Sequence, residues 1–337
     1  MRATFTDTQD ALREAVRDLL SDHAGSAAVR AAAFDGNGFD ADLWALLVSM
    51  GVTDLPGAIE QGIVAEEIGR VVAPVPYVEH QVATAALAAA EGDDLVGQMA
   101  SGEVLAIYAP AQVVRMEDGN LHGRLAAVPH AAAATHLVVD ADDGDQRVLA
   151  VVEADAVKRE TLPTMDRTRP LADVVLDAVP AVLAVPGVVV AGAPAALTAA
   201  TLYSHDLIGV GQTCLDLGVE HAKTREQFGK VIGTYQAVSH RLVDMYVALE
   251  SARSHAYHAA WAVAAGEDVA ELAASQAKAT ASRAAVVCAE GAIQVHGGIG
   301  FTWEHDLHLY LKRARSSAAL AGATSHHLRR IADLIGV

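Results

Sequence analysis

The first hundred residues follow a helical pattern of apolar and polar positions. Near the start, apolar residues three or four positions apart share one helix face: Leu12, Val16, Leu19 and Leu20. Thr6 and Gln9 form a capping box before them, and Gly25 is suited to end the helix. Pro74 and Pro76 interrupt the pattern later. Further helices are expected at 43–47, 58–71 and 79–91.

The period changes near residue 103. Four short segments are rich in β-branched residues, are bounded by turn residues and predict strands: 104–108, 135–140, 148–152 and 172–176. Asp142–Asp145 predicts a hairpin between two of them, and Asp118–Asn120 predicts another turn. We therefore expect a small antiparallel β unit in the middle of the chain.

From Ala195 almost to the end, the pattern is again helical. Four long segments are expected: 202–223, 235–265, 269–293 and 306–319. They predict an antiparallel four-helix bundle. The predicted fold class is α+β and mostly α, with an N-terminal helical domain at 1–102, a middle β domain at 103–190 and a C-terminal helical bundle at 191–337.

Composition narrows the functional classes. A chain of 337 residues with a net charge of −18 is unsuited to bind nucleic acid, because the phosphates need clusters of Lys and Arg. Cys214 and Cys288 lie far apart, so neither a disulfide framework nor a zinc set is implied. Three prolines interrupt the uncharged stretch 178–204, which favours a buried strand and helix over a membrane span. The start of the chain lacks a signal-peptide pattern, so we expect a cytoplasmic protein.

A glycine-rich stretch, Gln294–Phe301 (QVHGGIGF), follows the third long helical segment. A dinucleotide fingerprint instead leaves a strand and opens a helix. Gly297 and Gly298 still allow a backbone to approach a phosphate closely, because they have no side chain. The alternative is that the glycines only end the helix.

Two other stretches carry side chains suited to a nucleotide: Arg225–Lys230 (REQFGK) and Gln236–His240 (QAVSH). Arg225 has a fork of donors that suits a pyrophosphate, and Phe228 has a flat face for an adenine or ribose. Gln236 and Gln294 can bond sugar hydroxyls or phosphate oxygens. Arg225 alone could equally cap a helix or pair with a carboxylate. Together, these residues favour a nucleotide site.

These motifs, in this order within a helix–sheet–helix arrangement, resemble the acyl-CoA dehydrogenase family. The resemblance extends over nearly the whole chain and includes Val64–Arg70 (VAEEIGR) and Asp166–Arg169 (DRTR). It implies FAD as the cofactor, with the ADP half bound for the neighbouring subunit across a dimer interface. We call the implied set the ADP cradle: Arg225, Gln227, Phe228, Gln236, Gln294, Gly297 and Gly298.

Two parts of the family's active site are missing. The family's usual base is a glutamate followed by Gly and then Thr or Ser, but Ala321 precedes Gly322 here. The other position that some members use, on the first long bundle helix, corresponds to Ala199. The family's Thr-Glu-Pro-like loop, which holds the flavin ring and the thioester, has no counterpart in 102–180. We therefore expect no catalytic residue in this chain and a reduced β unit.

Other polar residues have simpler explanations. Glu290, Glu304 and Asp306 lie near the glycines, but a polar helix face and a helix start account for them. Three histidine pairs have spacings that could bind a metal: His255 and His258, His305 and His308, His326 and His327. No HExxH motif and no Cys or carboxylate set completes them, so no metal site is expected.

The chain keeps the ADP cradle and lacks the base and the flavin-ring loop. In this respect it resembles the smaller subunit of heteromeric acyl-CoA dehydrogenases. The resemblance implies an α2β2 heterotetramer that α,β-desaturates an acyl-CoA, specifically a steroid side-chain CoA thioester, and passes electrons to an electron-transfer flavoprotein. A homologous larger subunit would supply the glutamate and the flavin-ring pocket, so this chain alone would be inactive. Two alternatives stay open: a homo-oligomeric acyl-CoA dehydrogenase with an unrecognised base, and a non-catalytic flavin-binding or assembly protein.

Overall fold

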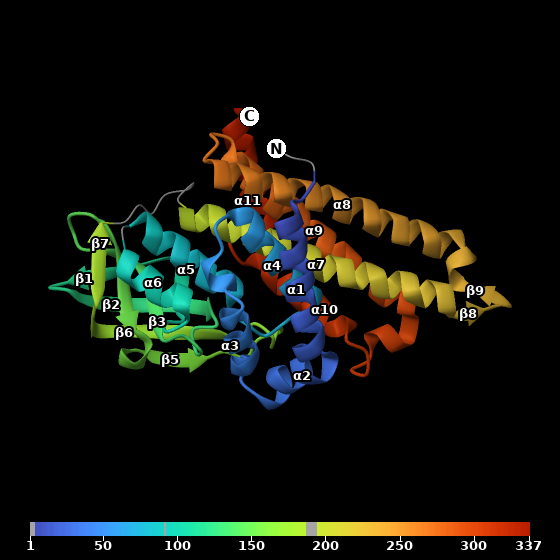
Figure 1. Ribbon diagram of the computed structural model, residues 1–337, viewed down its shortest axis with the longest axis horizontal. Helices are drawn as coiled ribbons and strands as arrows, with labels where there is room; N and C mark the ends of the chain where they lie inside the picture. The colour runs from blue at the N-terminus through green and yellow to red at the C-terminus, as the bar shows by residue number, and fades with distance from the viewer. Residues whose placement is uncertain (1–3, 91, 187–193) are drawn as a thin grey trace. The chain divides into compact units, whose positions relative to one another are not determined.

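The computed structural model describes residues 4–90, 92–186 and 194–337 (Figure 1). The chain forms two compact units. Unit 1 comprises Met1–Val29, Gly57–Ala73 and Ala200–Val337, and unit 2 comprises Arg30–Pro56 and Pro74–Ala199. The three-part division at 102 and 190 stays a prediction. Glu91 and residues 187–193, where one predicted helix end and one predicted boundary fall, lie outside the described residues.

Unit 1 is helical. Its elements are α1 (Asp7–His23), α4 (Ala58–Arg70), most of α7 (Pro194–Thr224), α8 (Gln236–Ala265), α9 (Ala270–His296), α10 (Leu307–Ala319) and α11 (Thr324–Ile335). A short hairpin, β8 (Glu226–Gln227) with β9 (Lys230–Val231), lies beyond the ends of α7 and α8 in Figure 1. Single 3₁₀ turns follow it at Ile232–Thr234 and follow α9 at Gly297–Phe301. The four long helices predicted from the sequence are confirmed, and α11 was missed.

Local chemistry explains the helix starts and crossings. The capping box is present at α1, where Thr6 and Gln9 bond each other's backbone N–H groups at 3.2 and 3.0 Å. α4 and α7 cross at backbone contact, because a Cβ at Gly69 would lie 2.1 Å from the oxygen of Asp206. A Cβ at Gly209 would lie 2.0 Å from the oxygen of Glu66. Both glycines are therefore required by packing.

α9 is the apolar centre of the bundle. Together with the following turn, residues 270–301 are long and apolar enough to cross a membrane, but half of the apolar window is buried. The buried face consists mainly of small residues and packs on α8, α10 and α11. A core helix passes the same length and composition test, so we assign α9 to the core of unit 1.

Unit 2 combines short helices with a sheet. α2 (Ser26–Arg30) lies in unit 1 except for its last residue. The helical elements of unit 2 are the π-helical Ala31–Asp35, α3 (Ala41–Ser49), α5 (Tyr77–Ala89) and α6 (Asp93–Ser101), with 3₁₀ turns at Val52–Asp54 and Ala154–Ala156. The strands are β1 (Ala106–Glu117), β2 (Asn120–Pro129), β3 (His136–Asp142), β4 (Arg147–Glu153), β5 (Lys158–Thr161), β6 (Leu171–Pro180) and β7 (Leu183–Pro186). They form a seven-stranded sheet in the order β5-β6-β2-β1-β3-β4-β7.

The sheet is mixed, which corrects the antiparallel prediction. β1 pairs with β2 antiparallel and with β3 parallel. Alternation identifies strands but does not say which strands pair, and here residues 130–135 return the chain to the other side of β1. β2, β5 and β7 were missed, because Gly123 and several alanines weaken the β-branched pattern of β2 and the other two are short.

The predicted hairpin at Asp142–Asp145 is confirmed. Asp142 pairs with Arg147, and Asp143 Oδ1 accepts from the backbone N–H groups of Asp145 and Gln146 at 3.0 and 2.8 Å. The predicted turn at Asp118 is also confirmed and connects β1 to β2. Turn chemistry in this chain is local, so the sequence alone located both turns.

Candidate functional site

The motif that begins at Arg225 forms the end of α7 and the β8–β9 hairpin. Phe228 and Gly229 make the turn with φ values of 53° and 80°. The hairpin is tied to the chain that follows it, because the Tyr235 hydroxyl donates to the Gln227 carbonyl at 3.0 Å. The Ile232 N–H donates to the Arg225 carbonyl at 2.8 Å. Arg225, Gln227 and the start of α8 at Gln236 are therefore held close together.

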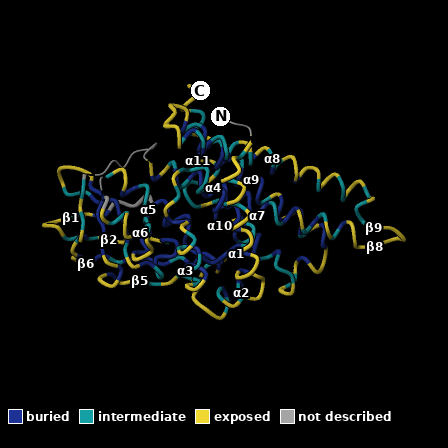
Figure 2. Tube along the Cα trace, viewed as in Figure 1, coloured by how far each residue is buried: buried dark blue, intermediate teal, exposed yellow. Residues whose placement is uncertain are grey.

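Phe228 lies at the tip of this hairpin with 92% of its surface exposed. Among the described aromatic rings, only that of Tyr235 contacts it, in an edge-on arrangement with the ring centroids 6.5 Å apart. Figure 2 shows the hairpin as an exposed extension of unit 1. A single exposed apolar side chain is common on protein surfaces, so the role of Phe228 depends on the groups around it.

The glycine turn is open on its outer side. Gly297 follows α9 with φ 63° and ψ −137°, a conformation that glycine adopts far more readily than other residues. A Cβ added at Gly297 or Gly298 would meet nothing within 4 Å, and both residues are exposed. The backbone at Gly297 thus needs glycine, and the space beside both glycines is free for a ligand to approach.

A contact between two histidines shows that the hairpin and the glycine turn lie at the same end of the bundle. His221 of α7 stacks on His296 of α9, with centroids 4.2 Å apart and planes 21° apart. His221 lies one helical turn before Arg225, and His296 directly precedes Gly297. His305 meets His296 edge-on at 4.6 Å. Neither histidine was predicted as a site residue, although His296 lies inside the glycine-rich stretch Gln294–Phe301.

Arg225 supplies an available cation at this end. It is exposed and forms no ion pair within the described ranges, so pairing with a carboxylate does not occupy it. Gln236 and Gln294 are also exposed, while Gln227 donates to the adjacent Glu226 carbonyl at 2.8 Å. A cationic fork, free amides, an exposed ring and an open glycine turn fit the diphosphate and adenosine of an FAD.

Neither predicted base position offers a proton acceptor. Ala321 lies between α10 and α11 with φ 53°, and its carbonyl accepts from His327 Nε2 at 2.8 Å. Lys278 Nζ donates to the carbonyls of Ala318 and Gly322 on either side, at 3.2 and 3.3 Å. These three hydrogen bonds hold the loop in place. The side chain at position 321 is a methyl group, which cannot accept a proton. Ala199, on α7, is half-buried and equally inert.

The other acids near the glycines have structural positions. Glu290 pairs with Arg315, and Asp306 is the N-cap residue of α10. Glu304 is exposed just before that helix. Among the residues that the structure describes, no group of three or more His, Cys, Asp or Glu side chains could hold a metal ion.

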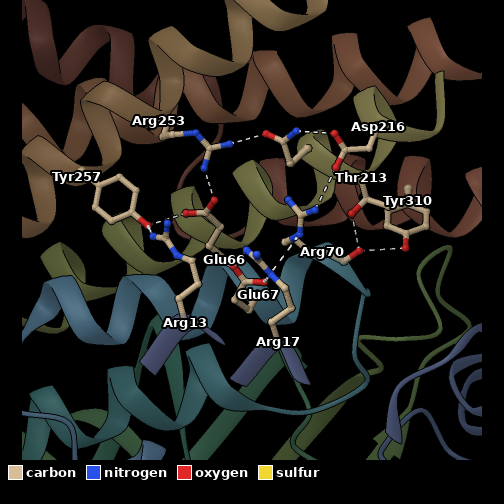
Figure 3. A network of polar contacts seen from close by, with 11 residues as sticks. Arg13, Arg17, Glu66, Glu67, Arg70, Thr213, Asp216, Arg253, Tyr257 and Tyr310 are labelled. Carbon is tan, nitrogen blue, oxygen red and sulfur yellow. Dashed lines mark hydrogen bonds and ion pairs between the residues drawn. The ribbon is translucent and has the colours of Figure 1, made fainter. Parts of the chain in front are cut away.

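A buried charge network lies elsewhere in unit 1, around the VAEEIGR motif (Figure 3). Glu66 accepts from Arg253 and from the Tyr257 hydroxyl, the latter at 2.6 Å. Glu67 accepts two hydrogen bonds from Arg17, at 2.7 and 2.9 Å. Burial alone would raise the pKa of Glu66, but Arg253 and Tyr257 outweigh it and hold that pKa below its ordinary value. The network connects α4 to α1 and α8.

Comparisons with known proteins agree with this architecture. The profile described as "Acyl-CoA dehydrogenase, C-terminal domain" matches residues 201–336. The chain is 36% identical over 344 residues to acyl-CoA dehydrogenase IpdE2 of Mycobacterium tuberculosis, with 97% of each protein covered.

Two solved structures are similar over nearly their whole length. One is a variant of the Tcur3481–Tcur3483 steroid ACAD, with 29% identity, a TM-score of 0.89 and 98% of each chain covered. The other is the ChsE4–ChsE5 complex from Mycobacterium tuberculosis, with 25% identity, a TM-score of 0.91 and 100% of each chain covered. The fold, the motifs and these similarities agree, and the chain belongs to the acyl-CoA dehydrogenase family.

Proposed function

We propose that this chain is the smaller, base-free subunit of a heteromeric FAD-dependent acyl-CoA dehydrogenase. The observation that carries the proposal is a contrast between two positions. Arg225 is exposed, forms no ion pair among the described residues and lies at the same end of the bundle as an open glycine turn, whereas the side chain at Ala321 is a methyl group. The chain thus offers groups to bind a nucleotide but no carboxylate at either base position.

The names of the similar structures support a two-subunit assembly. Both are named as pairs of proteins, and one is named as a steroid ACAD. We extend both properties to this chain: the partner is a homologous larger acyl-CoA dehydrogenase subunit in an α2β2 heterotetramer, and the substrate is a steroid side-chain CoA thioester. Electron-transfer flavoprotein is the proposed acceptor, and the cytoplasm the proposed location.

In this proposal, the chain binds the ADP half of FAD. Arg225 would hold the pyrophosphate, Gly297 and Gly298 would let the backbone approach it, and Phe228 would cover the adenosine. Bound flavin supplies a hydride acceptor for the α,β-desaturation. The glutamate that takes the α-proton and the pocket around the flavin ring come from the partner subunit.

Flavin content tests the proposal. The chain is co-expressed with its partner, and the flavin-to-protein absorbance ratio is measured after gel filtration for wild type, Arg225→Ala and Arg329→Ala. Arg329 is an exposed arginine of α11 and serves as the matched control. We expect a large loss only in Arg225→Ala. Equal flavin content in all three proteins would refute the ADP cradle.

Activity tests the division of labour. Dye reduction is measured with a panel of acyl-CoA and steroid-CoA thioesters, on the lone chain and on the co-expressed pair. We expect turnover only in the pair. Clear turnover by the lone wild-type chain would mean that a base lies elsewhere in it, and would favour the homo-oligomeric alternative.

A further inference from the structure

We propose that the stacked pair His221 and His296 belongs to the ADP cradle and that His221 binds the diphosphate in its protonated form, so that nucleotide binding takes up protons. This inference rests on the proposed function, because it requires a diphosphate beside Arg225. Its basis is the imidazole cluster formed by His221, His296 and His305 at the junction of the two cradle motifs.

The hydrogen bonds of the cluster show which ring nitrogen of His296 and of His305 carries the hydrogen. His296 Nδ1 lies 2.8 Å from the Ala292 carbonyl, which only accepts, so Nδ1 carries the ring hydrogen. His305 Nδ1 instead accepts from the Leu307 N–H at 3.2 Å. That bond occupies Nδ1, so the ring hydrogen of His305 is assigned to Nε2.

The surroundings of His221 disfavour its charge while no ligand is bound. Partial burial lowers its pKa, and His296, Arg225 and His305 lower it further. α7 contributes His221 and leads directly to Arg225, α9 contributes His296, and the chain before α10 contributes His305 and its neighbour Asp306. On α8, Leu242 and Met245 lie near Gly218, one turn before His221, and the titratable or charged residues of this stretch of α8 are His240, Arg241 and Asp244.

An anion reverses this balance. A diphosphate held by Arg225 and the glycine turn places negative charge next to the stacked imidazole pair, which favours the imidazolium form of His221. The bound-state pKa then lies above the free-state pKa, so binding takes up protons between the two values and tightens as pH falls through that window. A rise of one pKa unit on binding corresponds to about tenfold tighter binding at the acidic end of the window.

Calorimetry on the full chain can measure this coupling directly with ADP as the probe, because all cradle residues lie on this chain. Titrations in two buffers of different ionisation enthalpy give the number of protons taken up, and a series from pH 8 to pH 5.5 gives the change in Kd. For wild type we expect net proton uptake and a Kd that falls about tenfold over this range.

Two opposite substitutions separate charge from packing. His221→Gln should bind ADP at all pH values as weakly as wild type does at pH 8, with reduced proton uptake. His221→Arg carries a permanent charge and should bind at pH 8 about as tightly as wild type does at low pH. His258→Gln is the matched control, because His258 stacks on Trp261 of the same helix and lies outside the cluster.

Each outcome decides between the proposals. ADP binding that is lost in Arg225→Ala but shows the same pH dependence in His221→Gln as in wild type would overturn this inference and leave the cradle intact. ADP binding that is absent, or unchanged in Arg225→Ala, would overturn the cradle itself and this inference with it. A loss of pH dependence in both His221 variants, with His221→Gln binding weakly at low pH and His221→Arg binding tightly at pH 8, would establish the inference.

Discussion

Unit 1 contains two groups of polar residues, which differ in whether their charged side chains have partners within the unit. In the network around Glu66 and Glu67, buried charges meet partners inside the same unit, and the carboxylates are 2–3% exposed. At the cradle end, Arg225, Gln236 and Gln294 face solvent, and Arg225 has no carboxylate partner among the described residues. Charges that are satisfied internally hold the helices together, whereas charges left open at a glycine turn are available to a ligand.

The largest expected effect is a loss of stability in the buried network. Glu66→Ala leaves Arg253 and Tyr257 without their shared carboxylate, and removing one partner of a buried pair costs about 3–5 kcal/mol. Urea unfolding should show this decrease. The control Glu290→Ala removes an exposed pair with Arg315 and should cost about 1 kcal/mol or less. Equal losses in the two variants would contradict the distinction drawn here.

The next effect is on stability as a function of pH. Burial lowers the pKa of His205 to about 4, below the ordinary value of about 6.5. Between these values the unfolded chain binds the proton and the folded chain does not, so stability is lost as pH falls from about 6.5 to 4, by about 1.4 kcal/mol per pH unit for this residue. His205→Gln should flatten the curve in that window. An unchanged slope would mean that His205 is not buried as a neutral ring.

A smaller free-energy change is expected at the cradle. Arg225→Ala should weaken FAD binding in the assembled complex about tenfold or more, which is about 1.4 kcal/mol, with the urea midpoint nearly unchanged. Arg225→Lys should fall between wild type and the alanine variant, because a lysine keeps the charge and loses the bidentate geometry. A drop in stability equal to that of Glu66→Ala would instead make Arg225 a structural residue.

The smallest expected effect is at Ala321. Ala321→Glu should not give the lone chain dehydrogenase activity, because a carboxylate without a held flavin ring and thioester contributes little. Dye reduction is compared for the lone variant and the co-expressed pair. Turnover by the lone variant would show that a complete flavin-ring pocket already exists in this chain.

Much of the fold could be predicted, because its cues are local. The capping box at Thr6, the hairpin at Asp142–Asp145 and the four long helices were found from neighbouring residues. The parallel pairing of β1 with β3 was not, since register between distant strands leaves no local pattern. α11 was missed as well, although it is strongly amphipathic, because it begins only a few residues after α10 ends.

Of the candidate site, the sequence located the motifs but not the contact that joins them. The motifs located Arg225 and the glycine turn, and the assignment of the ADP cradle to FAD stays a prediction. The contact between His221 and His296 could not be predicted, because it joins two helices that are far apart in the chain. Its sequence traces are a histidine one turn before Arg225 and a histidine directly before Gly297, and a lone histidine on a helix has many simpler explanations.

The crossing of α4 and α7 has a consequence for mutational scanning. Gly69 and Gly209 each lie against the backbone of the other helix, so every substitution there should be depleted in a library selected for soluble protein. The cradle residues Arg225, Gln236 and Gln294 are exposed and should tolerate substitution in the same selection. A scan of this chain alone would thus highlight positions that bind nothing, and only a selection for flavin in the presence of the partner would reveal the cradle.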